Sequence, residues 1–113
     1  MSVKKKDISI TVELDENNVP TAIEWNADDL EKDIAHCRAM LLSMWDHEGK
    51  DTLRLDLWTK KMTVDEMKIF FYQTLVTMAD TFEQSTSEEG MAEDMRDFCN
   101  YFANKMEIKK EGS

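Results

Sequence analysis

The sequence predicts an α+β fold: a three-stranded antiparallel sheet with helices packed on one face, in the element order β-β-α-β-α-α. Two periodicities lead to this prediction. Apolar residues alternate with polar ones in three segments, as in strands with one buried face, and recur every three to four residues in three others, as in amphipathic helices. The chain of 113 residues has the length of one domain. We therefore expect a single domain over residues 8–108, between a flexible basic tail at 1–7 and a flexible tail at 109–113.

The first two strands are expected over residues 8–14 and 19–25 as a hairpin. In the first segment the apolar residues occupy every second position: Ile8, Ile10, Val12 and Leu14. Turn-forming residues fill positions 15–18, and Pro20 stands at the beginning of the second strand, where a missing N–H group is tolerated.

A helix is expected next, over residues 28–47. Its apolar positions fall on one helical stripe: Leu30, Ile34, Cys37, Leu41, Met44 and Trp45. Asn26 is a suitable N-cap, and Gly49 follows the end. Residues 51–58 alternate again and predict a third strand, which a right-handed crossover would place beside the first, in the sheet order 2-1-3.

Two further helices complete the prediction. Thr63 and Glu66 have the spacing of a capping box, so a helix begins there and its main apolar stripe reaches Phe82. A second apolar row, formed by Ile69, Tyr72, Val76 and Ala79, widens the apolar face so much that we expect it to be covered on two sides. Thr86 and Glu89 repeat the capping-box spacing and predict the start of the last helix, whose stripe ends near residue 106.

Charge excludes several classes of function. The formal charge is −10, whereas nucleic-acid binding and docking on anionic membranes require an excess of Lys and Arg. No apolar stretch is long enough for a transmembrane helix or has the form of a signal peptide, so we expect a cytoplasmic protein. Cys37 and Cys99 lie on apolar stripes, which predicts two buried, reduced thiols rather than a disulfide.

No combination of residues predicts catalysis, a cofactor or a metal site. His36 and His47 would lie far apart along the same helix, and metal-binding cysteine pairs and phosphate-binding glycine loops do not occur. Residues 46–51 resemble part of a calcium loop but lack essential acidic ligands, so we interpret them as a helix end and a loop. We therefore expect that the protein is not an enzyme.

Large side chains outside the predicted core stripes are the candidate partner interface: Trp58, Phe70, Ile69, Val76 and Tyr101. Trp58 lies on the face opposite Leu53, Leu55 and Leu57, where it either bends over the next helix or is exposed. Most of the nine methionines lie on apolar stripes, so core filling is the first interpretation. A groove that can repack around partners, with Met40 and Met62 accessible, is the alternative.

Several segments closely resemble the gliding-motility protein GldC family of the Bacteroidetes. They are VELDENNVP at 12–20, SMWD at 43–46, DTLRLDLWTKKMTVDEMKIFFYQTLVTMADTFE at 51–83 and DMRDFCNYF at 94–102. The likeness extends over residues 8–108 and is weakest between Asp28 and Met40. It implies a small cytoplasmic accessory protein of gliding motility with neither catalytic activity nor cofactor, and it transfers no functional residue.

The sequence thus favours an adapter or chaperone-like protein that binds another component of the motility or secretion apparatus. Five lysines lie in the terminal segments, so the folded body is more acidic than the whole chain and a basic protein surface is the expected partner. One alternative is a homodimer whose interface uses the second apolar row. Another is a small-ligand or enzymatic domain with Asp56, Tyr72 or His47 lining a pocket.

Overall fold

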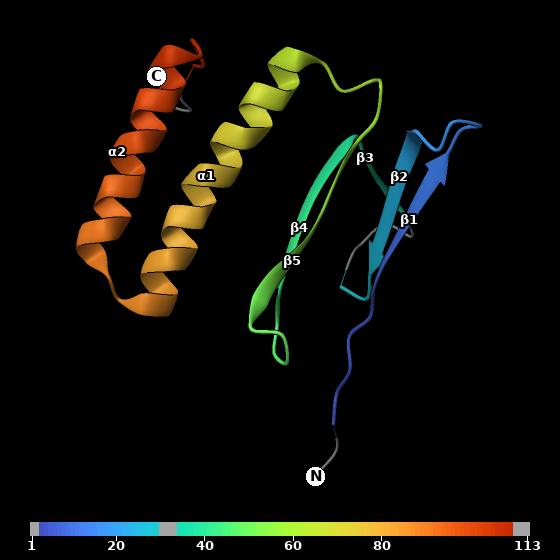
Figure 1. The fold of residues 1–113 in the computed structure, drawn as a ribbon, viewed down its shortest axis with the longest axis horizontal. Helices are drawn as coiled ribbons and strands as arrows, with labels where there is room; N and C mark the ends of the chain where they lie inside the picture. The colour runs from blue at the N-terminus through green and yellow to red at the C-terminus, as the bar shows by residue number, and fades with distance from the viewer. Residues whose placement is uncertain (1–2, 30–33, 110–113) are drawn as a thin grey trace. The chain divides into compact units, whose positions relative to one another are not determined.

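The computed structural model describes residues 3–29 and 34–109, which form five strands and two helices (Figure 1). The elements are β1 (Ile8–Leu14), β2 (Pro20–Ala27), β3 (Ala35–Cys37), β4 (Ala39–Asp46), β5 (Asp51–Trp58), α1 (Val64–Thr86) and α2 (Glu89–Lys105). They fall into two compact units: a strand unit that ends at Met62 and a helix unit that begins at Thr63. The expected α+β class is confirmed, while the single domain, its flexible tails and the packing of helices on the sheet stay predictions.

The strand unit contains a three-stranded antiparallel sheet in the order β1-β2-β3. The predicted first hairpin is confirmed, because β1 and β2 pair with Val12 opposite Ile23 and Ile10 opposite Trp25. β3 pairs on the other side of β2, with Cys37 opposite Ile23. Ile23 therefore has an apolar neighbour on both sides and is only 1% exposed.

The helix predicted over residues 28–47 is wrong. The structure has β3 and β4 there, and Leu30 of the expected stripe lies outside the described residues. The reason lies in residues 40–42, where Met40, Leu41 and Leu42 are consecutive apolar residues that hide the alternation of a strand. Because Ala, Leu and Met also favour helices, the pattern fits a helical stripe equally well.

This correction also changes the partners of the predicted third strand. β5, which covers residues 51–58, pairs antiparallel with β4 in a separate two-stranded sheet and does not lie in the three-stranded sheet, so the expected order 2-1-3 is wrong. Arg38 alone separates β3 from β4, and its carbonyl accepts the N–H of Thr59 at 2.8 Å. The segment 35–46 thus pairs with β2 through its first part and with β5 through the rest.

In the helix unit, α1 begins with the predicted capping box. Thr63 Oγ1 accepts the N–H of Glu66 at 3.1 Å, and Glu66 Oε1 accepts the N–H of Thr63 at 3.1 Å. The capping box predicted at Thr86 and Glu89 is wrong, because α1 continues to Thr86 and is followed by its C-cap Ser87, whose φ of 60° is left-handed. α2 follows with Glu88 as its N-cap and without a side-chain cap.

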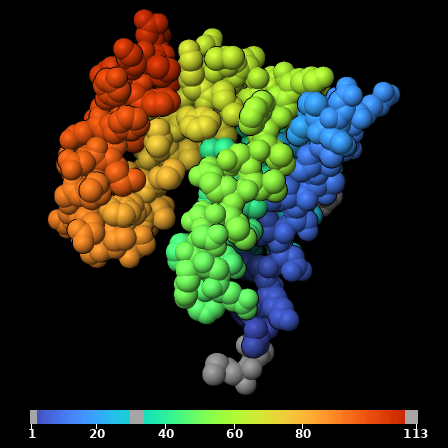
Figure 2. All heavy atoms as spheres, viewed as in Figure 1, coloured from blue at the N-terminus to red at the C-terminus, as the bar shows by residue number. Residues whose placement is uncertain are grey.

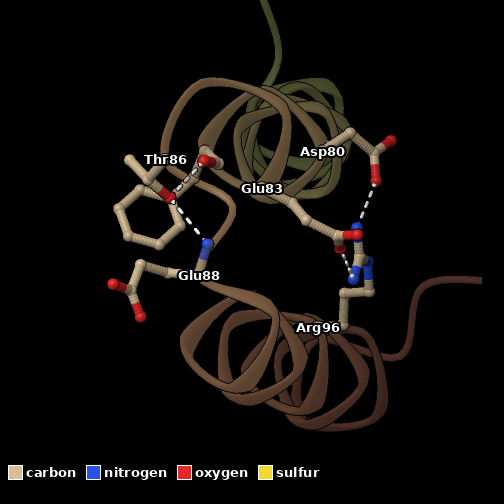
Figure 3. Close-up of polar contacts among 6 residues, drawn as sticks. Asp80, Glu83, Thr86, Glu88 and Arg96 are labelled. Carbon is tan, nitrogen blue, oxygen red and sulfur yellow. Dashed lines mark hydrogen bonds and ion pairs between the residues drawn. The ribbon is translucent and has the colours of Figure 1, made fainter.

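Thr86 instead joins the end of α1 to the start of α2 (Figure 3). Its hydroxyl donates to the carbonyl of Phe82 at 2.7 Å and accepts the N–H of Glu88 at 3.1 Å. A hydroxyl group can do both at once, so one side chain satisfies a carbonyl at the end of one helix and a backbone donor just before the next.

α1 and α2 pack together as a helical hairpin (Figure 1). Small side chains fill its centre: Ala79 of α1 and Ala92, Cys99 and Ala103 of α2 are buried. Arg96 of α2 binds two carboxylates of α1, with 2.9 Å to Asp80 Oδ1 and 2.7 Å to Glu83 Oε1 (Figure 3). The hydrogen bonds that Arg96 donates, first to Asp80 and then to Glu83, raise the pKa of Arg96 above its ordinary value, so Arg96 remains protonated.

Candidate interaction surfaces

One face of the two-stranded sheet of β4 and β5 is apolar except at its turn end, where Asp46 pairs with Asp51. Its side chains stand in directly opposite pairs, because Met40 pairs with Leu57, Leu42 with Leu55 and Met44 with Leu53. We call these six side chains the hairpin face. β5, drawn in green, is visible on the molecular surface in Figure 2. Met44 is 58% exposed, Leu53 56% and Leu55 49%.

This exposure differs from the sequence-based expectation that the leucines of residues 51–58 form part of the core. Leu57 is half-buried, whereas Leu53 and Leu55 are exposed. Similarly, Ile8 and Leu14 of β1, predicted to line a buried face, are 72% and 53% exposed. Exposed apolar side chains that adjoin one another on a regular sheet are typical of a binding surface.

Trp58 is the last residue of β5 and pairs with Ala39. It lies on the face opposite Leu57, since neighbouring residues of a strand point to opposite faces. Its side chain is 56% exposed, so of the two outcomes considered for Trp58 the structure has the exposed one.

Ile69 and Val76 of α1 lie together in one groove of the helix unit. Tyr72, Gln73 and Thr77 of the same helix line it as well, and Ile108 and Lys109 close it from the other side. Ile69 is 42% exposed and Val76 is half-buried, so the second apolar row of α1 is only partly covered. Ala79, the last member of that row, is fully buried against the other helix.

Phe70 and Tyr101 do not belong to this groove. Phe70 is half-buried, and its ring meets that of Phe71 edge-on with 6.3 Å between the centroids. Tyr101 of α2 is 58% exposed, and its ring centroid lies 6.0 Å from that of Phe98, which is itself 51% exposed. Of the five candidate residues, Ile69 and Val76 thus share a groove.

Of the residues considered for a ligand pocket, Asp56 and His47 belong to the strand unit, where they lie apart along the β4–β5 hairpin, and Tyr72 belongs to the helix unit. Arg54 donates to Asp56 at 3.1 Å on the surface of β5, and His47 lies in the turn between β4 and β5. Tyr72 lies in the groove of α1, in the helix unit. In residues 3–29 and 34–109, moreover, no three His, Cys, Asp or Glu side chains gather in a way that could hold a metal ion.

The segment with a likeness to a calcium loop is the turn of the β4–β5 hairpin and not a helix end. Asp46 and Asp51 pair at its base, and the N–H of Gly49 donates to Asp46 Oδ2 at 2.8 Å. A β-carbon on Gly49 would lie 2.6 Å from that oxygen, so glycine fits the close approach of the two groups. The carboxylate of Asp46 thus stabilises the turn.

The comparisons with known proteins agree with the resemblance seen in the sequence. The sequence model of the gliding motility-associated GldC-like proteins matches residues 20–108. Neither the curated proteins nor the solved structures that were searched include a match. Among the described residues, no helix is both long enough and apolar enough to cross a membrane. Because the matched segment includes β2 to β5 and both helices, the chain belongs to the gliding motility-associated GldC-like family.

Proposed function

We propose that this GldC-like protein is a cytoplasmic, non-enzymatic accessory protein of gliding motility that binds another protein as an adapter or chaperone-like module. The observation that carries the proposal is the hairpin face, where six apolar side chains stand in pairs and Met44, Leu53 and Leu55 are about half exposed or more. Burying apolar surface contributes roughly 25 cal/mol per Å². Covering such a face therefore supplies a substantial driving force for association.

Charge favours a basic partner. The chain has 24 acidic and 14 basic residues. The acidic side chains repel a second acidic protein and attract a basic one, and they raise the rate at which a basic partner is encountered. We propose further contact points at five residues: Trp58, the groove residues Ile69 and Val76, Phe70 of α1 and Tyr101 of α2.

A photo-crosslinking amino acid at Leu55, in living cells that glide, tests the proposal. A matched probe at Arg54 lies on the same strand and points to the opposite face. We expect a specific protein to be captured from position 55 and not from 54, and Leu53→Ser should weaken the capture from position 55. Replacing both Leu53 and Leu55 by serine should abolish gliding. Normal gliding in a double variant that is folded and present at the normal level would refute the role of this face.

The alternative is a homodimer that forms through the hairpin face. An apolar face on a two-stranded sheet can pack against its own copy around a twofold axis. The acidic charge opposes this association, so we expect a monomer at micromolar concentration. Sedimentation velocity distinguishes the two: a stable dimer that dissociates in the Leu53→Ser, Leu55→Ser variant would assign the hairpin face to a second copy.

A further inference from the structure

The strand β1 forms a long edge of the three-stranded sheet. It pairs with β2 on one side, and among the described residues no strand pairs with its other side (Figure 1). All of its residues except Val12 are exposed. The opposite edge of the sheet belongs to β3, which has only three residues. An edge strand presents a row of backbone N–H and C=O groups, so β1 is the edge of this sheet that can pair with a further strand.

The features that usually protect an edge strand are missing from the centre of β1. Proteins block such edges with charged side chains, proline, bulges or very short strands. Residues 8–12 contain no charged residue, proline or glycine, and the irregularity in the pairing with β2 lies near the end of the strand, between Glu13 and Leu14. β5, by contrast, carries Arg54 and Asp56 in the middle of its length. The open edge of β1 is thus suited to pairing.

The apolar residues of β1 are self-complementary in one antiparallel register. In this register two copies of β1 are related by a twofold axis through Thr11. The apolar residues then lie opposite one another: Ile8 opposite Leu14 and Ile10 opposite Val12 of the second copy. A shift of the axis by one residue would instead place Lys6 or Glu16 opposite an apolar residue. Because opposite apolar side chains stabilise a pair of strands, the register at Thr11 is favoured.

The charges at the two ends of β1 are complementary in the same arrangement. Three lysines precede the strand and three carboxylates lie at or just after its end: Lys4, Lys5 and Lys6, and Glu13, Asp15 and Glu16. Antiparallel pairing brings the basic segment of each copy to the acidic end of the other. Lys6 and Asp15 have ion-pair partners in their own chain, whereas Lys5 and Glu16 have none among the described residues. This local attraction opposes the general repulsion between two acidic chains.

From this self-complementarity we propose that β1 pairs with β1 of a second copy of this chain, antiparallel and centred on Thr11. The two three-stranded sheets then form one continuous sheet in the order β3-β2-β1-β1-β2-β3. The edges of the combined sheet are the short β3 strands, so the association closes at two copies. This contact is separate from the hairpin face, because β1 contains none of the six side chains of that face.

The small size of the contact limits the strength of the association. One strand of seven residues pairs with another, and interfaces below about 1,200 Å² are typically weak. We therefore expect a dissociation constant of about 0.1–1 mM, which leaves the chain monomeric at micromolar concentration. Two copies held on one partner have an effective concentration in the millimolar range, and pairing of β1 joins them there.

Hydrogen exchange followed by NMR, at micromolar and at millimolar protein concentration, tests the proposal. The amides of β1 that face the open edge exchange rapidly in the monomer. We expect them to be protected at the higher concentration, because carbonyl groups of the second strand then accept their hydrogen bonds. The amides of Leu53 and Leu55 should not respond. Exchange of the β1 amides that does not depend on concentration would overturn the proposal, as would a response at Leu53 and Leu55 in place of β1.

Thr11 and Ser9 provide a matched pair of variants, since both are exposed on the same face of β1. Thr11 lies opposite its own copy at the axis, so Thr11→Lys brings two like charges together and should weaken dimerisation several-fold. Ser9 lies opposite Glu13 of the second copy, so Ser9→Lys adds a pair of opposite charges and should not weaken it. Sedimentation equilibrium at millimolar concentration measures both dissociation constants, and equal values would contradict the register.

Reversing single charges tests the contact between the ends of the strands. Glu16→Lys places an ammonium group beside the basic segment of the second copy, and we expect it to weaken dimerisation although it lowers the net negative charge of the chain. Lys5→Glu should weaken dimerisation as well. The double variant has the original net charge and restores opposite charges, so we expect it to dimerise as the unaltered protein does. A tighter dimer in Glu16→Lys alone would show that net charge decides the affinity and would overturn the antiparallel arrangement.

Discussion

Thr63 and Glu66 cap the first turn of α1 reciprocally, with each side chain accepting the backbone N–H of the other at 3.1 Å. Replacing Thr63 by alanine leaves the N–H of Glu66 without its acceptor, so we expect the free energy of unfolding to fall by about 1 kcal/mol. Urea denaturation followed by circular dichroism measures this. Thr63→Ser keeps the acceptor and should lose much less, and equal losses in both variants would show that the cap is not the cause.

For Thr59→Val we expect the free energy of unfolding to change in the opposite direction. Its buried hydroxyl has no hydrogen-bond partner among the described residues, so Thr59→Val removes an unfavourable group and should raise the free energy of unfolding by about 1 kcal/mol. The measurement is again urea denaturation. Thr74→Val is a suitable control, because Thr74 Oγ1 already donates to the carbonyl of Phe70 at 2.7 Å. A loss of stability in Thr59→Val would show that its hydroxyl is satisfied in solution.

Asp15 predicts a dependence of stability on pH. The backbone N–H of Val19, 3.0 Å from its carboxylate, and then that of Asn17 at 2.8 Å lower the pKa of Asp15 below its ordinary value of 3.8. The folded state therefore favours the ionised form, which stabilises the protein above the ordinary pKa and ceases to do so as the pH falls through the lowered value.

Asp15→Asn removes this contribution. We expect the variant to be less stable than the unaltered protein at pH 7, and the difference to shrink as the pH is lowered below about 4. Thermal unfolding across this range measures the effect. A difference that stays constant down to the lowest pH at which the protein folds would mean that the pKa of Asp15 is not lowered.

The helical hairpin predicts sensitivity to side-chain size at Ala79. This residue is fully buried where α1 packs on α2, and Ala92 and Ala103 of the facing helix are buried as well. A leucine at 79 would overfill the interface and should lower the free energy of unfolding by about 1–3 kcal/mol. Thr81 is exposed on the same helix, so Thr81→Leu should change stability little. Similar losses in the two variants would show that the interface is loosely packed.

A helix or strand can be predicted from the sequence when its apolar residues fit the period of only one of the two. β1, with an apolar residue at every second position, and α1, with its capping box, were both predictable for this reason. β4 was not, because Leu41 and Trp45 add apolar side chains on the face opposite Met40, Leu42 and Met44. Only pairing with β5 shows which face is which, and pairing is a property of two segments rather than of one.

The candidate surfaces show the same limit. Exposure of Trp58 was considered from its place in the alternation, and the nearness of Ile69 and Val76 follows from their separation by two helical turns. The pocket beside Thr59, lined by β2, by β3 and by residues after β5, could not be predicted, because only the strand register brings these three segments together. The exposed hairpin face is not predictable from the sequence for a related reason. The alternation at Leu53 and Leu55 is that of a strand with one buried face, and only the structure shows that β4 is their neighbour and that these side chains are exposed.

Within the described residues, each extensive pairing of helices or strands joins elements that are consecutive in the chain: β1 with β2, β2 with β3, β4 with β5, and α1 with α2. Contacts between such near neighbours need only short loops to close, and chains rich in local contacts cross their folding barrier quickly. We therefore expect refolding after rapid dilution from urea on the millisecond timescale or faster. Each hairpin can also form as soon as its second arm leaves the ribosome, before the rest of the chain has been made.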